Sequence, residues 1–162
     1  MSKTIMVVDD KASVRQLVEE YLTSQGYKVV TADNGRNALY TARHEKPDLV
    51  LLDVMMPKVD GFTVCRILKG SGKPILIPVI LLTALQAHED RVRCIEAGAD
   101  DFISKPFESI DLLSRAKSYA RLNRKVVELE KKSGHDKLTG LFSVASFEEQ
   151  GEKALSFALR HK

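Results

Sequence analysis

The chain has 162 residues with 25 Lys and Arg against 22 Asp and Glu, so its formal net charge is only +3. An apolar content of 44% is enough for a hydrophobic core and argues against intrinsic disorder. The sequence contains neither a run of 18 apolar residues nor an apolar signal segment after Met1, so we expect a cytoplasmic protein with no membrane span.

Five strand-like segments alternate with helix-like segments along the chain. Leu49–Leu52 and Val79–Leu82 are continuous apolar runs, which are typical of parallel strands buried on both faces. The alternation predicts an α/β fold, a doubly wound parallel sheet with right-handed crossovers. The predicted strands are 4–8, 28–32, 48–53, 77–82 and 101–104.

The segments between these strands have the spacing of amphipathic helices. In the first helix the apolar spacing predicts one stripe that faces the sheet. Val92 and Ile95 mark the fourth helix in the same way, ahead of Gly98. The stripe of the first helix consists of Val14, Leu17, Val18, Tyr21 and Leu22.

The last predicted helix is longer than the sheet it follows. The stretch 109–132 contains neither Pro nor Gly, and a helix of this length spans about 36 Å. Strands of about five residues cannot cover it, so we expect its second half to protrude rather than to pack on its own domain. Its apolar residues resemble a short coiled-coil seam. They are Leu112, Tyr119, Leu122, Val126 and Leu129.

The region from residue 109 onward is basic, with a net charge of +4 against −1 for residues 1–108. Its cations follow a helical pattern and no nucleic-acid recognition motif accompanies them. We therefore interpret them as a solvated helix face and expect no direct nucleic-acid binding. Cys65 and Cys94 lack the spacing of a metal site and are predicted to be two buried thiols.

Polar side chains stand where four of the predicted strands end. Asp9 and Asp10 follow the first strand, Asp53 ends the third, Thr83 follows the fourth and Lys105 follows the fifth. In open parallel sheets, ligands bind beyond the carboxyl ends of the strands. Three carboxylates repel one another unless a cation neutralises them, and Mg2+ prefers oxygen ligands. A carboxylate beside such a cation can act as a nucleophile toward phosphorus, whereas the plainer interpretation is a solvated acidic cluster.

Together these residues resemble the motif set of the receiver domain of two-component response regulators, over about residues 3–120. The resemblance implies a flavodoxin-like sheet of order 2-1-3-4-5 and a partner that is a histidine kinase or phosphotransfer protein. The motifs that carry it are Asp9-Asp10, Asp53-Val54-Met55-Met56-Pro57, Asp60-Gly61, Thr83-Ala84, Gly98-Ala99-Asp100-Asp101 and Lys105-Pro106-Phe107.

The resemblance also implies roles for single residues. Asp53 would accept the phosphoryl group. Mg2+ would be held by Asp10, Asp53 and the backbone carbonyl of Met55, with Asp9 helping through water. Lys105 would contact the phosphoryl group, ahead of a cis bond to the next residue.

Two further sets of residues follow from the same resemblance. Thr83 and Phe102 would form the switch pair. A homodimer favoured by phosphorylation would use ionic positions like those of the winged-helix response regulators. These positions are Arg91, Asp101, Asp111 and Arg115.

The C-terminal part carries a second resemblance. The motif 136–142, followed by Phe147, is similar to the opening of a GGDEF diguanylate cyclase domain, although Ser143-Val144 departs from it. We therefore expect a receiver domain at 1–120, a protruding signalling helix at 121–133, and a partial GGDEF-like segment or helical tail at 134–162. The chain ends before any nucleotide-binding part of such a domain, so no cyclase activity is expected of it.

Two other functions compete with a phosphorylation switch. A haloacid-dehalogenase-type phosphatase also uses an Asp nucleophile, but its first strand would end in Asp-x-Asp, whereas this strand is followed by Asp9-Asp10-Lys11. An interaction module without phosphate chemistry would not need Asp53, Thr83 and Lys105 together. A stand-alone receiver that acts by protein–protein interaction stays open as the alternative to a cyclase output.

Overall fold

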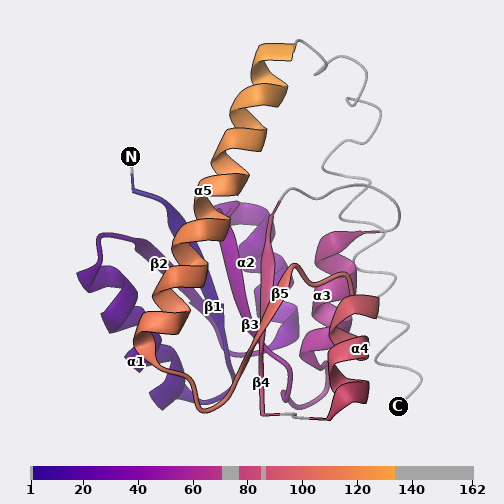
Figure 1. Ribbon diagram of the computed structural model, residues 1–162. Coiled ribbons are helices and arrows are strands. Elements are labelled where there is room, and N and C mark those ends of the chain that lie inside the picture. Colours follow the sequence, from indigo (N-terminus) through magenta and orange to yellow (C-terminus); the bar gives the residue numbers. More distant parts are fainter. Residues whose placement is uncertain (1, 71–76, 85–86, 134–162) are drawn as a thin grey trace.

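The computed structural model describes residues 2–70, 77–84 and 87–133 (Figure 1). It has one five-stranded parallel sheet of order β2-β1-β3-β4-β5, which confirms the predicted fold class. The elements in chain order are β1 (Thr4–Val8), α1 (Ala12–Ser24), β2 (Lys28–Ala32), α2 (Gly35–Glu45), β3 (Leu49–Asp53), α3 (Gly61–Lys69), β4 (Val79–Thr83), α4 (His88–Glu96), β5 (Asp101–Ser104) and α5 (Ser109–Ser133).

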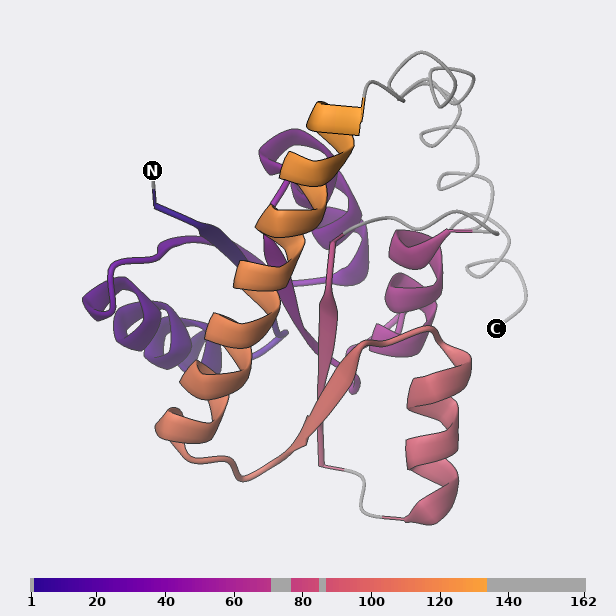
Figure 2. The same cartoon turned by 45° about the horizontal axis from the view of Figure 1, so that its top comes forward.

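Helices cover both faces of the sheet, as Figures 1 and 2 show from two directions. One apolar cluster joins the sheet to α2, α3 and α4, and a second joins it to α1 and α5. All residues of β3 and β4 are buried between these layers, as their continuous apolar runs predicted. The register pairs Val8 with Leu52 and Asp53 with Leu82, so the carboxyl ends of the central strands meet at one edge.

Two of the predicted helix stripes need correction. Val18 and Leu22 of α1 are buried, but Leu17 is 66% exposed, since a neighbouring position is turned by about 100° around the helix. In α4, Val92 and Ile95 are exposed and Cys94 is the buried residue. In the sheet, α4 packs mainly on β5, which is an edge strand and offers a helix less surface than the central strand β3.

The helix α5 runs for 25 residues, and Figure 1 shows its C-terminal part extending past the sheet, as its length predicted. Its first half packs on the sheet through Leu112, Ala116 and Ala120, which are buried. The predicted seam is therefore only partly free within the described residues: Leu112 is buried and Tyr119 packs partly buried against the domain, whereas Leu122 is exposed. The side chains of Val126 and Leu129 lie outside the described residues.

Cys65 and Cys94 are buried, as predicted. Burial raises the pKa of the Cys65 thiol to about 12. Among the described helices, none has the length and apolar character needed to cross a membrane.

Candidate functional site

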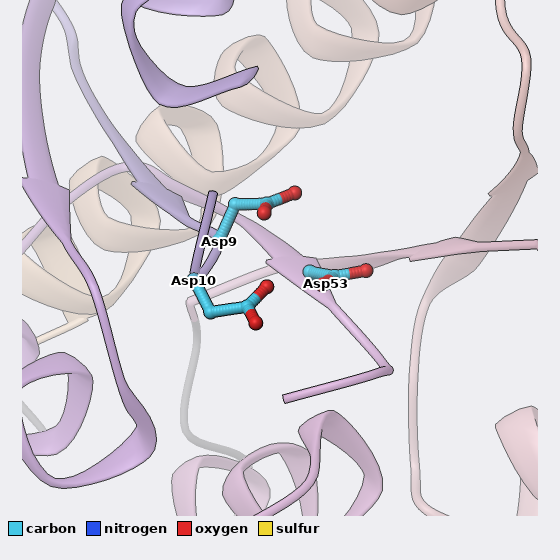
Figure 3. A group of neighbouring side chains, drawn as sticks. All are labelled: Asp9, Asp10 and Asp53. Atoms are coloured by element: carbon cyan, nitrogen blue, oxygen red, sulfur yellow. The ribbon is translucent and has the colours of Figure 1, made fainter. Parts of the chain in front are cut away.

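The ends of β1, β3, β4 and β5 bring the predicted polar residues to one edge of the sheet. Asp53 is the last residue of β3 and Thr83 the last of β4, while Asp9 and Asp10 follow β1. Figure 3 shows the three carboxylates directed into one space, and one oxygen of each lies within 4.8 Å of the others. Lys105 follows β5, and its N–H donates to the carbonyl of Thr83 at 2.7 Å.

A single ammonium group bridges two of these carboxylates. Lys105 Nζ donates to Asp9 Oδ2 and to Asp53 Oδ1, each at 3.0 Å. Asp9 is fully buried and Asp53 is 4% exposed, whereas Asp10 is exposed. The site therefore has a closed side, held by Lys105, and an open side at Asp10. The bond between Lys105 and Pro106 is cis, as expected.

Burial and the neighbouring charges shift the pKa values in this group. Burial raises the pKa of Asp53, although the hydrogen bond and the charge of Lys105 act in the opposite direction. Burial alone would lower the pKa of Lys105, but its hydrogen bonds to Asp53 and Asp9 outweigh that effect and raise it. The raised pKa of Lys105 thus favours its ammonium form, whereas the raised pKa of Asp53 disfavours its carboxylate form.

Backbone contacts that the sequence did not predict hold Asp9. Its Oδ1 accepts from the N–H of Lys11 at 2.9 Å, and its N–H donates to the carbonyl of Ala32 at 3.2 Å. Its own carbonyl accepts from Arg15 Nη1 at 2.6 Å. The only sequence signal was the place of Arg15 on the first turns of the helix that follows Asp10.

A close backbone approach also supports Asp53. The N–H of Gly61, the first residue of α3, donates to the carbonyl of Val54 at 2.9 Å. A Cβ on Gly61 would lie 2.2 Å from the carbonyl oxygen of Asp53 and 2.7 Å from Val54 Cα. The absence of a side chain at Gly61 is therefore needed for α3 to pack against the loop that carries Asp53.

Gly61→Ala should impair the site through this contact. The methyl group must displace backbone, so we expect a loss of about 2 kcal/mol in the free energy of unfolding. We also expect phosphoryl transfer to Asp53, the role that the family resemblance implies, to slow by about tenfold or more, because Asp53 would be displaced. Denaturant unfolding and phosphodonor kinetics measure the two effects. Gly26→Ala is the control, because its Cβ meets no atom within 4 Å although its φ of +87° adds strain. Equal phosphorylation rates in both variants would contradict the prediction.

The predicted switch residues lie two positions apart on neighbouring strands. Thr83 pairs with Ser104, and Phe102 pairs with Leu81. Thr83 is buried and Phe102 is partly buried. The guanidinium carbon of Arg91 lies 5.8 Å from the centroid of the Phe102 ring, a contact between α4 and β5 that sequence reasoning missed.

The four residues predicted for a dimer face lie on α4, β5 and α5. Asp101 and Arg115 form an ion pair of 2.6 Å within the chain, with partly exposed side chains. Arg91 and Asp111 are exposed. The structure thus places the set on adjoining elements, while one pair is already joined within a single copy.

The chain is similar to known proteins in sequence. The model of the response regulator receiver domain matches residues 5–117. Response regulator PleD of Caulobacter vibrioides (strain NA1000 / CB15N) is 42% identical over 146 residues, which are 90% of this chain and 32% of the relative. The alkaline phosphatase synthesis transcriptional regulatory protein PhoP of Bacillus subtilis (strain 168) is 43% identical over 121 residues, 75% of this chain and 50% of the relative. The chain thus spans about a third of the first relative and half of the second.

Solved structures show the same likeness. The BeF3-activated N-terminal receiver domain of RstA from Klebsiella pneumoniae is 37% identical with a TM-score of 0.67, covering 75% of this chain and 99% of that one. The signal receiver domain of a signal transduction histidine kinase from Syntrophus aciditrophicus is 39% identical with a TM-score of 0.69, covering 74% and 91%.

Proposed function

The chain belongs to the response regulator receiver domain family, and from this membership we propose that it is a phosphorylation switch whose acceptor is Asp53. The observation that carries the proposal is the bridge of Lys105 between Asp9 and Asp53, beside an open Asp10. Such an arrangement leaves one carboxylate ready to receive a phosphoryl group and a cation ready to face the oxygens of that group.

The same donor set suits a divalent cation. Three carboxylates with oxygens within 4.8 Å of one another fit the preference of Mg2+ for oxygen ligands. We propose that Asp10, Asp53 and the carbonyl of Met55 hold it, with Asp9 assisting through water. When bound, Mg2+ would neutralise the carboxylates and the phosphoryl oxygens.

In the reaction, a carboxylate oxygen of Asp53 attacks phosphorus in the phosphohistidine of a kinase or phosphotransfer protein. The new O–P bond forms as the P–N bond breaks, and the electron pair of the P–N bond returns to the imidazole nitrogen of the donor. Lys105 remains an ammonium, since its pKa is raised, and stabilises the transferred oxygens. The hydroxyl of Thr83 would donate to one of those oxygens once they are in place and so couple the new group to Phe102.

A partner that brings phosphohistidine needs access to the open side of the site. Large apolar side chains are exposed on three elements that border the carboxyl edge of the sheet. Leu17 lies on α1, Met55 follows β3 and Ile110 lies in the first turn of α5, each more than 60% exposed. We propose that these residues contact the donor protein.

The proposal is tested with acetyl phosphate and Mg2+. The intact chain should gain the mass of one phosphoryl group, and alkali should remove it, because acyl phosphates are base-labile. No mass gain under conditions in which Mg2+ binds would contradict the function.

We propose that phosphorylation favours a symmetric dimer through α4, β5 and α5. In it, Arg91 and Arg115 of one copy would face Asp111 and Asp101 of the other, so the internal pair of Asp101 and Arg115 would be exchanged between copies. Val92 and Ile95 on α4 are exposed and would add an apolar contact between the two copies. This contact does not depend on the strength of the ion pairs.

Arg115→Glu should weaken that dimer. Each exposed ion pair contributes about 0.2–1 kcal/mol, and reversal of charge acts twice in a symmetric interface, so we expect roughly tenfold weaker dimerisation. Light scattering with a phosphoryl mimic measures the mass. Lys117→Glu, an exposed residue of the same helix with the same charge change, is the control. An activated wild-type chain that stays monomeric, or equal effects of both variants, would count against the dimer face.

We propose that the output in the full-length protein is a diguanylate cyclase. The motif 136–142 supports this, as does the alignment with PleD, which covers 146 residues where the one with PhoP covers 121. This motif and the segment 134–162 lie outside the described residues. We expect this chain to form no cyclic di-GMP from GTP and Mg2+, which chromatography would check. A receiver that acts through protein contacts alone is the alternative output.

A further inference from the structure

The guanidinium of Arg15 reaches back from α1 to the loop that carries Asp9 and Asp10. Its Nη1 lies 2.6 Å from the carbonyl oxygen of Asp9. Asp9 is 0% exposed, and among the described residues no other donor reaches this carbonyl. Arg15 therefore satisfies a buried acceptor that would otherwise cost free energy.

This bond has a geometric consequence for the next residue. The carbonyl of Asp9 is part of the planar peptide that joins it to Asp10, so a donor that fixes the carbonyl also fixes the plane of that peptide. Asp10 itself is exposed, and its carboxylate has no hydrogen bond or ion pair to any part of the chain that the structure describes. The direction of the Asp10 side chain toward Asp53, visible in Figure 3, thus depends on the backbone behind it.

We infer that Arg15 is a positioning residue for the cation site, acting on Asp10 through the Asp9 carbonyl. The inference rests on the proposed binding of Mg2+ by Asp10 and Asp53. Arginine suits the role because its planar fork holds a fixed direction and its charge is permanent.

The charge and the hydrogen bond of Arg15 lead to opposite expectations. The guanidinium on the Asp9 carbonyl brings a positive charge to this loop, so loss of its charge alone would tighten the binding of Mg2+. Loss of the hydrogen bond frees the peptide and would weaken it. Removal of partners that orient metal ligands typically costs 10–100-fold in affinity, so we expect weakening to dominate.

The test is the dissociation constant of Mg2+ alone, measured by isothermal titration calorimetry on the whole chain. Arg15→Met should bind Mg2+ about 10–100-fold more weakly than wild type, and Arg15→Lys, which keeps a cationic donor, should recover part of the loss. Arg36→Met is the matched control, since Arg36 is exposed on α2 and its loss changes the net charge equally. It should bind Mg2+ as the wild type does.

The free energy of unfolding, measured without Mg2+, distinguishes a positioning role of Arg15 from a merely structural one. A merely structural Arg15 would lower the free energy of unfolding and leave the Mg2+ constant of the folded fraction unchanged. An unchanged or tighter constant in folded Arg15→Met overturns the inference, and if that variant fails to fold, the constant of Arg15→Gln decides by the same criterion. A wild-type chain that binds no Mg2+ overturns the proposed cation site and the inference with it, whereas normal wild-type binding isolates the inference.

Discussion

Asp53→Asn is expected to abolish labelling by a small phosphodonor. The amide keeps the shape of the carboxylate but has neither its negative charge nor an oxygen able to form an acyl phosphate. The other two carboxylates do not replace it: Lys105 and the N–H of Lys11 occupy the oxygens of buried Asp9, and Asp10 lies on the exposed side. Transfer therefore falls to background rather than to an intermediate rate.

The measurement is the intact mass after exposure to acetyl phosphate and Mg2+, followed by treatment with alkali. Asp33→Asn is the control, because Asp33 is exposed, lies outside the site and accepts hydrogen bonds that an amide oxygen also accepts. It should label as the wild type does. Labelling of Asp53→Asn at wild-type stoichiometry would move the acceptor to another residue.

The fold could be predicted from the sequence because its central strands carry an unusually clear pattern. Leu49–Leu52 and Val79–Leu82 are uniformly apolar, a pattern that is typical of strands covered on both faces. The buried faces of the helices were harder to predict. A stripe of apolar residues says which side of a helix is favoured, but Leu17, Val92 and Ile95 show that the contact with the sheet can be narrower than the stripe.

The site also has features that the sequence predicts and features that it does not. Asp9, Asp10, Asp53, Thr83 and Lys105 could be placed together because each stands at the end of a strand, and parallel strands end at one edge. The bond from Arg15 to a carbonyl could not be predicted, because the direction of a peptide plane leaves no trace in residue type. The order of the strands came from the family resemblance rather than from periodicity, which is the same for any order.

Lys105→Met should produce the largest loss of stability among the variants discussed. It leaves two buried carboxylates, on Asp9 and Asp53, without the ammonium group that pairs with both of them. Removing one partner of a buried ion pair typically costs about 3–5 kcal/mol. Because the side chain of Lys105 is 23% exposed, we expect the lower end, about 3 kcal/mol at about pH 8. Lys28→Met, which breaks an exposed pair with Glu45, should cost no more than about 0.5 kcal/mol.

The dependence on pH identifies the cause of that loss. Asp53 has a raised pKa in the folded chain, chiefly through burial, and removal of Lys105 raises it further. A carboxyl whose folded pKa is raised binds its proton more tightly when folded, so stability falls as the pH rises from its unfolded pKa to its folded pKa. In Lys105→Met this window extends to higher pH. The gap to wild type should therefore be largest above the raised pKa and shrink as the pH is lowered through it.

The wild type should lose stability in a second, alkaline range as well. The folded pKa of Lys105 is raised, so its contribution is complete below the ordinary lysine pKa of 10.5 and is lost as the pH rises through the raised value. Denaturant unfolding without Mg2+, from acid to alkaline pH, records both trends. Added Mg2+ should stabilise Lys105→Met more than wild type, because the cation then replaces the missing positive charge. A gap that is constant across pH and insensitive to Mg2+ would mean that Lys105 stabilises the fold by packing and not by its charge.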